Sequence, residues 1–254
     1  MTDDIINPEH DGAKMTFQGA MSYGDYLRID DILSLQHPLS PAHDELLFII
    51  QHQTSELWMK QAIHELSAAR QALAMGQMPA MFKMLARVSR IFEQLNTAWD
   101  VLRTMTPADY TRFRETLWQS SGFQSYQYRM IEFILGNRNP NMLRPHAHVP
   151  QVHDWLSAEL ARPSFYDDAV TYLFQTLYGS VDKMPAPRLD GPHLAQPEIQ
   201  AAWQVVYSDI DRYWTLYELA EKLVDLEDYF RRWRFNHVTT VELFPEIWHL
   251  RGAL

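Results

Sequence analysis

Apolar residues recur every three or four positions along most of the chain, which is the spacing of one helix face. The clearest run lies in residues 81–105 and predicts a helix that faces the core. Its apolar positions are Leu85, Val88, Phe92, Leu95, Trp99 and Leu102. No sustained alternation of apolar and polar residues marks a strand. The pattern therefore predicts an all-α protein, a helical bundle-type single domain.

A second helix is predicted to begin at the segment 106–109. Thr106 supplies an N-cap, Pro107 suits the first helical position, and Asp109 places a carboxylate at the third. We expect this helix to carry Tyr110, Phe113, Arg114 and Leu117 on its first turns.

A longer helix is expected from Glu198, just behind Pro197, to about Arg234. Proline, asparagine and glycine accumulate in residues 136–150 and 182–197, which we interpret as loops. The length alone allows one or two domains. Because neither loop is long or polar enough to be a free linker, we favour a single domain over residues 21–254, preceded by a flexible segment at 1–20.

Composition narrows the possible partners and metal ligands. Hydrophobic residues make up 46% of the chain and aromatic residues 13%, which indicates an aromatic-rich interior. A formal net charge of −10 repels a phosphate backbone, so nucleic acid is not an expected partner. The absence of cysteine excludes disulfides, cysteine zinc sites and thiolate-ligated haem. Any metal must be held by His, Asp, Glu, Tyr or Met.

The chain carries no recognisable targeting or membrane signal. Residues 1–19 are polar and acidic, unlike a secretory signal. The longest aliphatic run, residues 46–50, is far shorter than the roughly 20 residues of a spanning helix. We therefore expect a cytoplasmic protein that does not enter a membrane.

The segment 48–58 places polar groups in a helix that otherwise looks buried. Its apolar stripe runs through Leu46, Ile50, Gln53 and Leu57. His52 and Glu56 lie one turn apart on an adjoining face, at the border of the core. A buried polar group needs a partner or a function. On this segment alone, His52 can be a core histidine bonded to a carbonyl or a functional group.

A second histidine continues an apolar stripe near the end of the chain. The stripe runs at steps of four and three through Leu219, Leu223, Leu226, Phe230, Trp233 and His237. His237 can be a satisfied core residue or an axial haem ligand that projects into an apolar slot. Arg231, Arg232 and Arg234 could reach haem propionates, or could form a solvated basic helix end.

Other metal and nucleophile sites find little support. A di-iron site needs two Glu-x-x-His pairs, and Glu246 with His249 is the one match. His146, His148 and His153 lie in a proline-bounded loop without a recognised zinc frame. Neither a Gly-x-Ser-x-Gly elbow nor a glycine-rich phosphate loop occurs.

Several long motifs, taken together, closely resemble the tryptophan 2,3-dioxygenase family from about residue 22 to the carboxyl end. They are Tyr23 to Leu27, Phe48 to Lys60, Phe113-Arg114, Ser120 to Ser125, Gln127 to Phe133, Asp211 to Trp214 and Trp233 to His237. The resemblance implies a helical, homotetrameric enzyme with a haem b pocket. It also implies insertion of both atoms of O2 across the indole C2–C3 bond of L-tryptophan. The product is N-formylkynurenine, at the first step of the kynurenine pathway.

The resemblance assigns roles to the two ambiguous histidines. His237 matches the proximal iron ligand, and Tyr128 and Trp233 fall in the motifs of the haem site. His52 matches the distal histidine that hydrogen-bonds the indole N–H. Replacing His52 by alanine should therefore slow turnover without abolishing haem binding.

The resemblance also implies a substrate pocket. Arg114 and Tyr110 match the groups that take the substrate carboxylate, and a planar guanidinium suits that ligand. Phe48 matches a residue that packs against the indole. The other positions implied are Leu117, the haem-side pair Ser121 and Gly122, and the amino-terminal tyrosines Tyr23 and Tyr26, which a neighbouring subunit lends to the pocket.

The chain departs from the family pattern at one place. The family carries a glycine-rich, threonine-containing segment after the proximal histidine, whereas here residues 238–242 run directly into the Phe-Pro-Glu motif at 244–246. Either this protein lacks the segment, or the segment is a mobile lid that is missing from this sequence. We favour the second explanation, because mobile lids often escape observation. A haem-binding scaffold that has lost catalysis is the alternative function. Retention of His52, Arg114 and Tyr110 argues against that alternative.

Overall fold

The computed structural model describes residues 12, 14–16, 19–189, 191 and 193–251, with side chains as far as residue 240. All regular structure in these residues is helical, as the sequence predicts. The helices are α1 (Tyr23–Leu27), α2 (Ile29–Leu33), α3 (His43–Ala74), α4 (Met78–Leu102), α5 (Pro107–Thr111), η2 (Arg114–Leu117), η3 (Gly122–Gln124), α6 (Tyr126–Leu135), η4 (Pro140–His146), α7 (Pro150–Leu160), α8 (Phe165–Tyr178), α9 (Pro197–Ser208) and α10 (Trp214–Arg251).

The chain divides into two compact units, Met1–Leu39 and Ser40–Leu254. The first unit contains α1 and α2, and neither helix buries a residue. A capping box between Ser22 and Asp25 starts α1. Most of the flexible segment expected at 1–20 lies outside the described residues.

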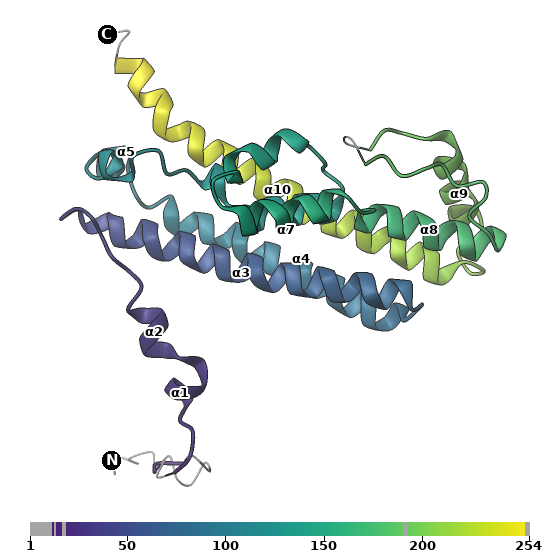
Figure 1. Cartoon of the computed structure of the whole chain (residues 1–254), viewed down its shortest axis with the longest axis horizontal. Coiled ribbons are helices and arrows are strands. Elements are labelled where there is room, and N and C mark those ends of the chain that lie inside the picture. The colour runs from purple at the N-terminus through teal and green to yellow at the C-terminus, as the bar shows by residue number, and fades with distance from the viewer. Residues whose placement is uncertain (1–11, 13, 17–18, 190, 192, 252–254) are drawn as a thin grey trace, which may run out of the picture. The chain divides into compact units, whose positions relative to one another are not determined.

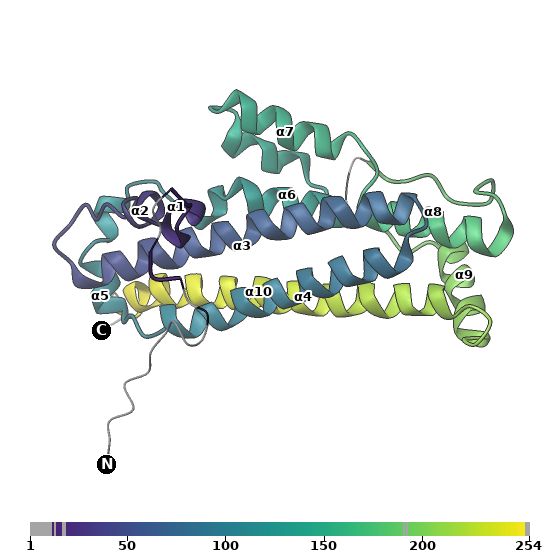
Figure 2. The same cartoon turned by 90° about the horizontal axis from the view of Figure 1, so that it is seen from below.

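Three long helices, α3, α4 and α10, form the framework of the second unit and lie side by side in both ribbon views (Figures 1 and 2). Helix α4 packs between α3 and α10. The six apolar positions predicted to face the core of α4 are all buried. This confirms the helix expected at 81–105. None of the described helices is long and apolar enough to cross a membrane.

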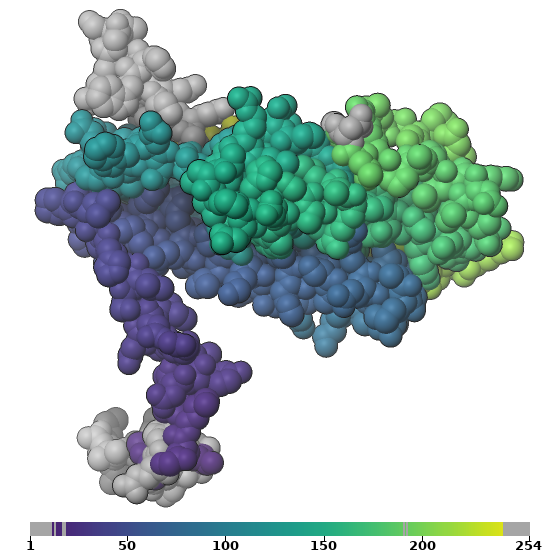
Figure 3. All heavy atoms as spheres, viewed as in Figure 1, coloured from purple at the N-terminus to yellow at the C-terminus, as the bar shows by residue number. Residues whose placement is uncertain are grey.

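Shorter helices cover the outer side of α3. Helices α6 and α8 pack on α3, and α7 packs on α6. The teal-to-green segment from η4 through α7 forms a broad part of the surface in the space-filling view (Figure 3). The loop expected at 136–150 contains η4, whereas the described residues of 182–196 carry no helix.

The junction of α3, α7 and α8 holds a network of buried charges. Arg70 on α3 donates to Glu159 of α7 at 2.8 Å and to Asp168 of α8 at 2.7 Å. Arg138 is fully buried and donates to the carbonyl oxygens of Leu160 and Arg162. A buried charge is costly without such partners, so the junction joins these three helices through paired charges.

Two predicted helices end earlier than expected. The helix from Pro107 stops at Thr111, because Phe113 leaves the helical conformation, with a φ of −125°, and buries its ring completely. The helix from Glu198 does not reach Arg234; α9 ends at Ser208 and α10 begins at Trp214. At the break, the Asp209 carboxylate accepts the backbone N–H of Arg212, a local bond that competes with the helix ladder.

The apolar stripe at the start of α3 is not buried within the described structure. Leu46, Ile50 and Leu57 are each about half exposed, whereas Ala62 and Leu66 further along the helix are fully buried. The expectation of an otherwise buried helix around His52 was therefore wrong for its first half. Burial of that stripe needs a partner that the second unit does not supply.

Candidate functional site

His52 lies in the middle of α3, with its Nδ1 atom 2.7 Å from the carbonyl oxygen of Phe48. A carbonyl oxygen only accepts, so Nδ1 must carry the proton. In the neutral ring, Nε2 is then left with a lone pair and can accept a hydrogen bond. One ring nitrogen of His52 is therefore bonded to a carbonyl, as expected of a core histidine, and the other nitrogen remains available.

The surroundings keep His52 neutral. Burial lowers the pKa of His52, and this effect exceeds the opposing influence of the Phe48 carbonyl and of the Glu56 charge. The Phe48 ring packs on the imidazole, with ring centroids 4.1 Å apart. At neutral pH, the ring accordingly presents an acceptor to the adjacent cavity.

His237 lies on α10 between two tryptophans. Its ring is parallel to that of Trp233 at 5.5 Å and tilted against that of Trp99 at 5.6 Å. Burial lowers the pKa of His237, and the nearby His52 adds to the shift. No described residue hydrogen-bonds the His237 ring. A neutral, unpartnered imidazole is the form that ligates a metal.

The two histidines line one cavity of about 50 Å³. The other lining residues are Gln51, Ser55, Glu56, Met59, Trp99, Leu102, Gly122, Ser125, Tyr128 and Trp233. The cavity is well below the roughly 300 Å³ of a typical ligand pocket.

The residues of the cavity fit an imidazole-ligated haem in their chemistry. The indole N–H of Trp99 is buried beside His237 and has no hydrogen-bond partner. A Cβ atom added to Gly122 would lie 3.5 Å from Nε2 of His237, so glycine keeps the ligand atom accessible. Free His Nε2, aromatic walls and an unsatisfied donor suit a large apolar ligand with an iron centre.

The expected carboxylate clamp lies beside the cavity. Tyr110 is half-buried at the end of α5, and its ring centroid is 6.1 Å from that of Phe48. Burial raises the pKa of Tyr110, which keeps the hydroxyl protonated as a donor. Arg114 lies in η2, not on the same helix as Tyr110, and donates to the carbonyl oxygen of Trp118 at 3.1 Å. Neither Tyr110 nor Arg114 lines the 50 Å³ cavity.

The connection from η2 to η3 is strained and exposed. Trp118 has a φ of +49°, which bulky residues rarely adopt, and its side chain is 83% exposed. Leu117 packs on the core, and Ser121 caps η3 by accepting the N–H of Phe123. Gly122 is the one member of this expected group that reaches the cavity.

Tyr128 and Trp233 approach the cavity from α6 and α10. Their ring centroids are 4.9 Å apart, and the Tyr128 hydroxyl donates to Glu132 at 2.8 Å. The arginines near His237 are occupied elsewhere. Arg231 pairs with Glu227 and Arg232 with Asp228, one turn earlier on α10.

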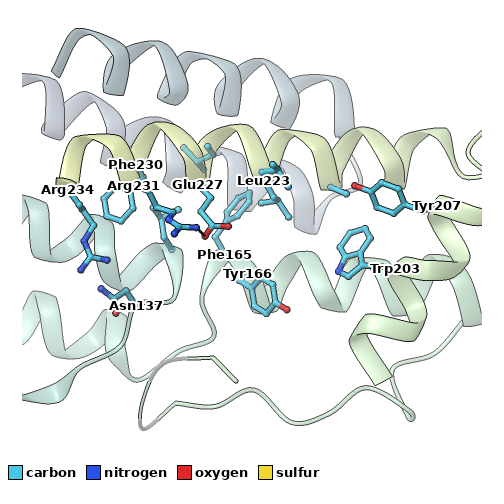
Figure 4. Close-up of a pocket in the computed structure, with 14 residues that line it drawn as sticks. Asn137, Phe165, Tyr166, Trp203, Tyr207, Leu223, Glu227, Phe230, Arg231 and Arg234 are labelled. Atoms are coloured by element: carbon cyan, nitrogen blue, oxygen red, sulfur yellow. Dashed lines mark hydrogen bonds and ion pairs between the residues drawn. The ribbon is translucent and has the colours of Figure 1, made fainter. Parts of the chain in front are cut away.

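A larger apolar groove lies away from the histidines. It measures about 540 Å³ and runs between α8, α9 and α10 (Figure 4). Arg231 and Glu227 form an ion pair within it, and Asn137 and Arg234 lie near each other at one end. Because it holds neither histidine, we place the chemistry at the smaller cavity despite the difference in volume.

Two features of the site escaped sequence reasoning. Trp99 was predicted only as a core position of α4. The helical spacing of apolar residues carries no information about whether its indole N–H finds a partner. Gln127 donates to the backbone and the side chain of Glu56, both at 2.8 Å, and so ties α6 to α3 at the cavity. The polar residues around His52, which include Glu56, were the signal that could have indicated this contact with Gln127.

Other predicted residues fall outside this cavity. Tyr23 and Tyr26 belong to the first unit, where they are 76% and 75% exposed. The side chains of Glu246 and His249 lie outside the described residues. Within the described part of the chain, His146, His148 and His153 form no cluster suited to a metal ion.

Comparison with known proteins gives a consistent result. The sequence model of a family described as tryptophan 2,3-dioxygenase matches residues 8–173 and 193–244. A protein of that name from Ruegeria sp. (strain TM1040) is 68% identical over 279 positions, and one from Bradyrhizobium sp. (strain BTAi1 / ATCC BAA-1182) is 57% identical over 281; each comparison covers all of both chains. A third, from Pseudomonas fluorescens, is 52% identical and covers 97% of this chain and 96% of the relative.

These alignments are longer than the chain itself. The Ruegeria comparison spans 279 positions, whereas this chain has 254 residues. The relative therefore has residues at positions where this chain has none. Within this chain, α10 continues without a break across residues 238–242, where the family pattern led us to expect a glycine-rich segment.

Proposed function

Because the chain belongs to the tryptophan 2,3-dioxygenase family, we propose that His52 and His237 divide the reaction between substrate and cofactor. The enzyme inserts both atoms of O2 into L-tryptophan across the indole C2–C3 bond, which gives N-formylkynurenine. The observation that carries the proposal is the single cavity that both His52 and His237 line.

His237 holds the iron of haem b. Its imidazole is neutral at pH 7 because burial lowers its pKa, and no described residue competes for the ring. Tyr128 and Trp233 pack the ligand side, and Gly122 leaves room at Nε2. Haem, when bound there, would supply the chemistry of O2 activation.

His52 orients the indole. With Nδ1–H committed to the Phe48 carbonyl, Nε2 accepts a hydrogen bond from the indole N–H. The neutral ring does not need to remove that proton, because the bond to be formed is at carbon. Phe48, packed on His52, offers a flat apolar face to the indole ring.

Tyr110 and Arg114 take the substrate carboxylate. The Arg114 guanidinium can exchange its single bond to the Trp118 carbonyl for a two-point contact with the carboxylate. Tyr110 adds a hydroxyl donor from the neighbouring helix α5. Anchoring the amino acid there leaves the indole pointing from Phe48 towards His52, with Leu117 and Ser121 along the same segment.

The working enzyme is a homotetramer in which one subunit lends Tyr23 and Tyr26 to the pocket of another. Support comes from two surfaces whose apolar residues remain exposed within one subunit. Helices α1 and α2 bury no residue of their own, and the first half of α3 leaves Leu46, Ile50 and Leu57 exposed. Both surfaces gain a partner when subunits associate. Sedimentation of the full chain tests this assembly.

The decisive experiment uses haem-loaded protein reduced without oxygen. L-tryptophan and then O2 are added, and the haem absorption band and N-formylkynurenine are recorded together. Many turnovers of product would establish the activity and show that the glycine-rich segment is either dispensable or present in the working protein. A haem spectrum without product would leave a haem-binding protein, and no haem band would remove the role given to His237.

The role of His52 is tested with a matched pair of substrates. L-tryptophan carries the indole N–H, and 1-methyltryptophan lacks it. If Nε2 of His52 accepts a hydrogen bond from that N–H, His52→Ala slows turnover of the first substrate and leaves that of the second nearly unchanged. Equal slowing of both substrates would indicate that His52 acts through packing instead.

A further inference from the structure

Glu132 is a buried carboxylate that the proposed reaction does not use. It lies on α6 and is 2% exposed. A carboxylate in such a place is costly unless donors surround it. Tyr128 and Asn137 both donate to Oε1 at 2.8 Å, and Arg129 pairs with Oε2. Three donors therefore hold the carboxylate, and Arg234 adds an ion pair at 3.8 Å.

Two of these four partners, Tyr128 and Arg234, lead to α10. Arg234 is itself a residue of α10, three positions before His237. Tyr128 packs its ring on Trp233 at 4.9 Å and on Phe230 at 6.2 Å. Asn137 and Arg234 lie near each other at one end of the large groove (Figure 4), so the carboxylate they share joins the end of α6 to α10.

The Trp233 ring continues the connection to His237. The two rings are parallel, with an interplanar angle of 0° and centroids 5.5 Å apart. Metal-binding histidines usually have their orientation set by a hydrogen bond at the second ring nitrogen. His237 has no such bond among the described residues, so packing on Trp233 and Trp99 must set the plane of its ring.

The opposite side of α10 is held separately by α4. Asn236 donates to Asn96 at 3.0 Å and accepts from Arg103 at 3.0 Å. This clamp on α4 fixes the backbone next to His237 but touches neither Trp233 nor Tyr128. Helix α10 is therefore held from two sides. Trp99 of α4 also packs on the rings of Trp233 and His237, whereas the α6 side reaches the imidazole through Tyr128 and Trp233 and leads back to the Glu132 carboxylate.

We propose that Glu132 is a positioning residue for His237. By holding the Tyr128 hydroxyl and Arg234 at once, it sets the Trp233 ring, and that ring sets the plane of the imidazole that ligates the iron. The inference rests on the proposed role of His237 as ligand. Burial, together with the Glu132 charge, also raises the pKa of Tyr128, which keeps the hydroxyl as a donor to Glu132.

The test measures the iron–imidazole bond and not only turnover. Holoenzyme carrying Glu132→Gln or Glu132→Ala is reduced, and the iron–imidazole stretching band is recorded by resonance Raman spectroscopy. The rate of haem loss to an excess of apomyoglobin is measured beside it. We expect a shifted, broadened band and haem loss about 10- to 100-fold faster, the usual size for an outer partner of a metal ligand.

The control is a second buried glutamate of similar environment. Glu65 on α3 is 4% exposed, accepts from Gln61 at 2.7 Å and pairs with Arg87 at 2.7 Å. It lies about 20 Å along the helix from His52. Glu65→Gln and Glu65→Ala should leave the band unchanged. An unchanged band in both Glu132 variants, or equal shifts from Glu65 and Glu132, would overturn the proposal.

A third variant covers failure of Glu132→Ala to fold. Tyr128→Phe keeps the ring on Trp233 and removes only the hydroxyl that Glu132 holds, so the band should shift in the same direction as in Glu132→Gln. His237→Ala separates the two levels of inference. If the wild-type band persists in His237→Ala, His237 is not the ligand and the proposal fails with it. If the band is lost, His237 is the ligand, and the Glu132 variants then test the positioning role by itself.

Discussion

The junction of α3, α7 and α8 and the histidine cavity are both buried and polar, but they treat polar groups in opposite ways. At the junction, Arg70 meets two carboxylates, Glu159 and Asp168, and a backbone carbonyl. At the cavity, Trp99 has a buried N–H without a partner, and His237 has no hydrogen bond among the described residues. Among the described residues, the junction pairs its charged groups and leaves Nε of Arg138 as its one buried unpartnered atom, whereas the unpartnered groups of the cavity face the place of a ligand.

The largest expected effect comes from breaking the junction. Arg70→Ala removes the α3 partner of the buried Glu159 and of Asp168, while Glu159 keeps Arg162. Leaving a buried charge uncompensated costs about 3–5 kcal/mol, so we expect a loss at the lower end of that range. Urea denaturation of the apoprotein measures the loss. Activity per folded molecule should stay close to that of the wild type, because the junction lines no part of the cavity. An Arg70→Ala protein of normal stability but low activity would contradict the assignment of stability to the junction and of activity to the cavity.

The second effect comes from the cavity and concerns rate. His52→Ala removes one neutral hydrogen bond to the substrate, worth about 0.5–1.5 kcal/mol, so turnover should fall about tenfold. The free energy of unfolding should change by less than in Arg70→Ala. Steady-state kinetics and denaturation on one preparation compare the two quantities. A loss of the haem band in this variant would contradict the assignment.

A smaller effect is expected at Trp99. Trp99→Phe removes an N–H that has no partner, which offsets much of the lost ring area, so stability should change by about 1 kcal/mol or less. Leu95→Ala, one turn earlier on α4 and equally buried, is the control and should cost about 2–5 kcal/mol. Thermal unfolding of both apoproteins gives the contrast. Similar losses would mean that the Trp99 N–H is satisfied in solution.

The smallest effect is the pH dependence of the cavity. Burial lowers the pKa of His52 and of His237 below the ordinary value of about 6.5. The unfolded chain therefore binds protons that the folded apoprotein refuses, and stability is lost as the pH falls below about 6.5 towards the folded pKa values. His52→Gln should weaken this dependence when denaturation is compared at pH 7.5 and 5.5. An unchanged slope would show that other histidines cause it.

The sequence predicted local structure where short-range signals agreed. The stripe of α4 and the capping box of Thr106 and Asp109 depend on neighbouring residues, and both occur as expected. The prediction failed where a distant contact decided. Phe113 leaves the helix to bury its ring against Phe48, so Arg114 falls in η2 and not one turn after Tyr110. Helical spacing carries no information about that competition.

The candidate site shows the same division. The placement of His52 and His237 beside apolar stripes indicated that both border the core, and each is half-buried beside it. Their meeting in one cavity could not be derived from spacing, because α3 and α10 are far apart in the chain. The unpartnered N–H of Trp99 could not be predicted either, because whether a donor is satisfied depends on its neighbours in space and not on the spacing of apolar residues.

By itself, the sequence determined the helical class, the helix starts and the faces that carry the two histidines, because periodicity and caps act over a few residues. Only the tertiary structure decided which polar groups find partners. Glu132 meets Tyr128 four residues away but also Arg234 from another helix, and Leu57 stays exposed although its pattern predicts burial. Pairing and burial depend on residues distant in the chain, and these come together only when the helices pack.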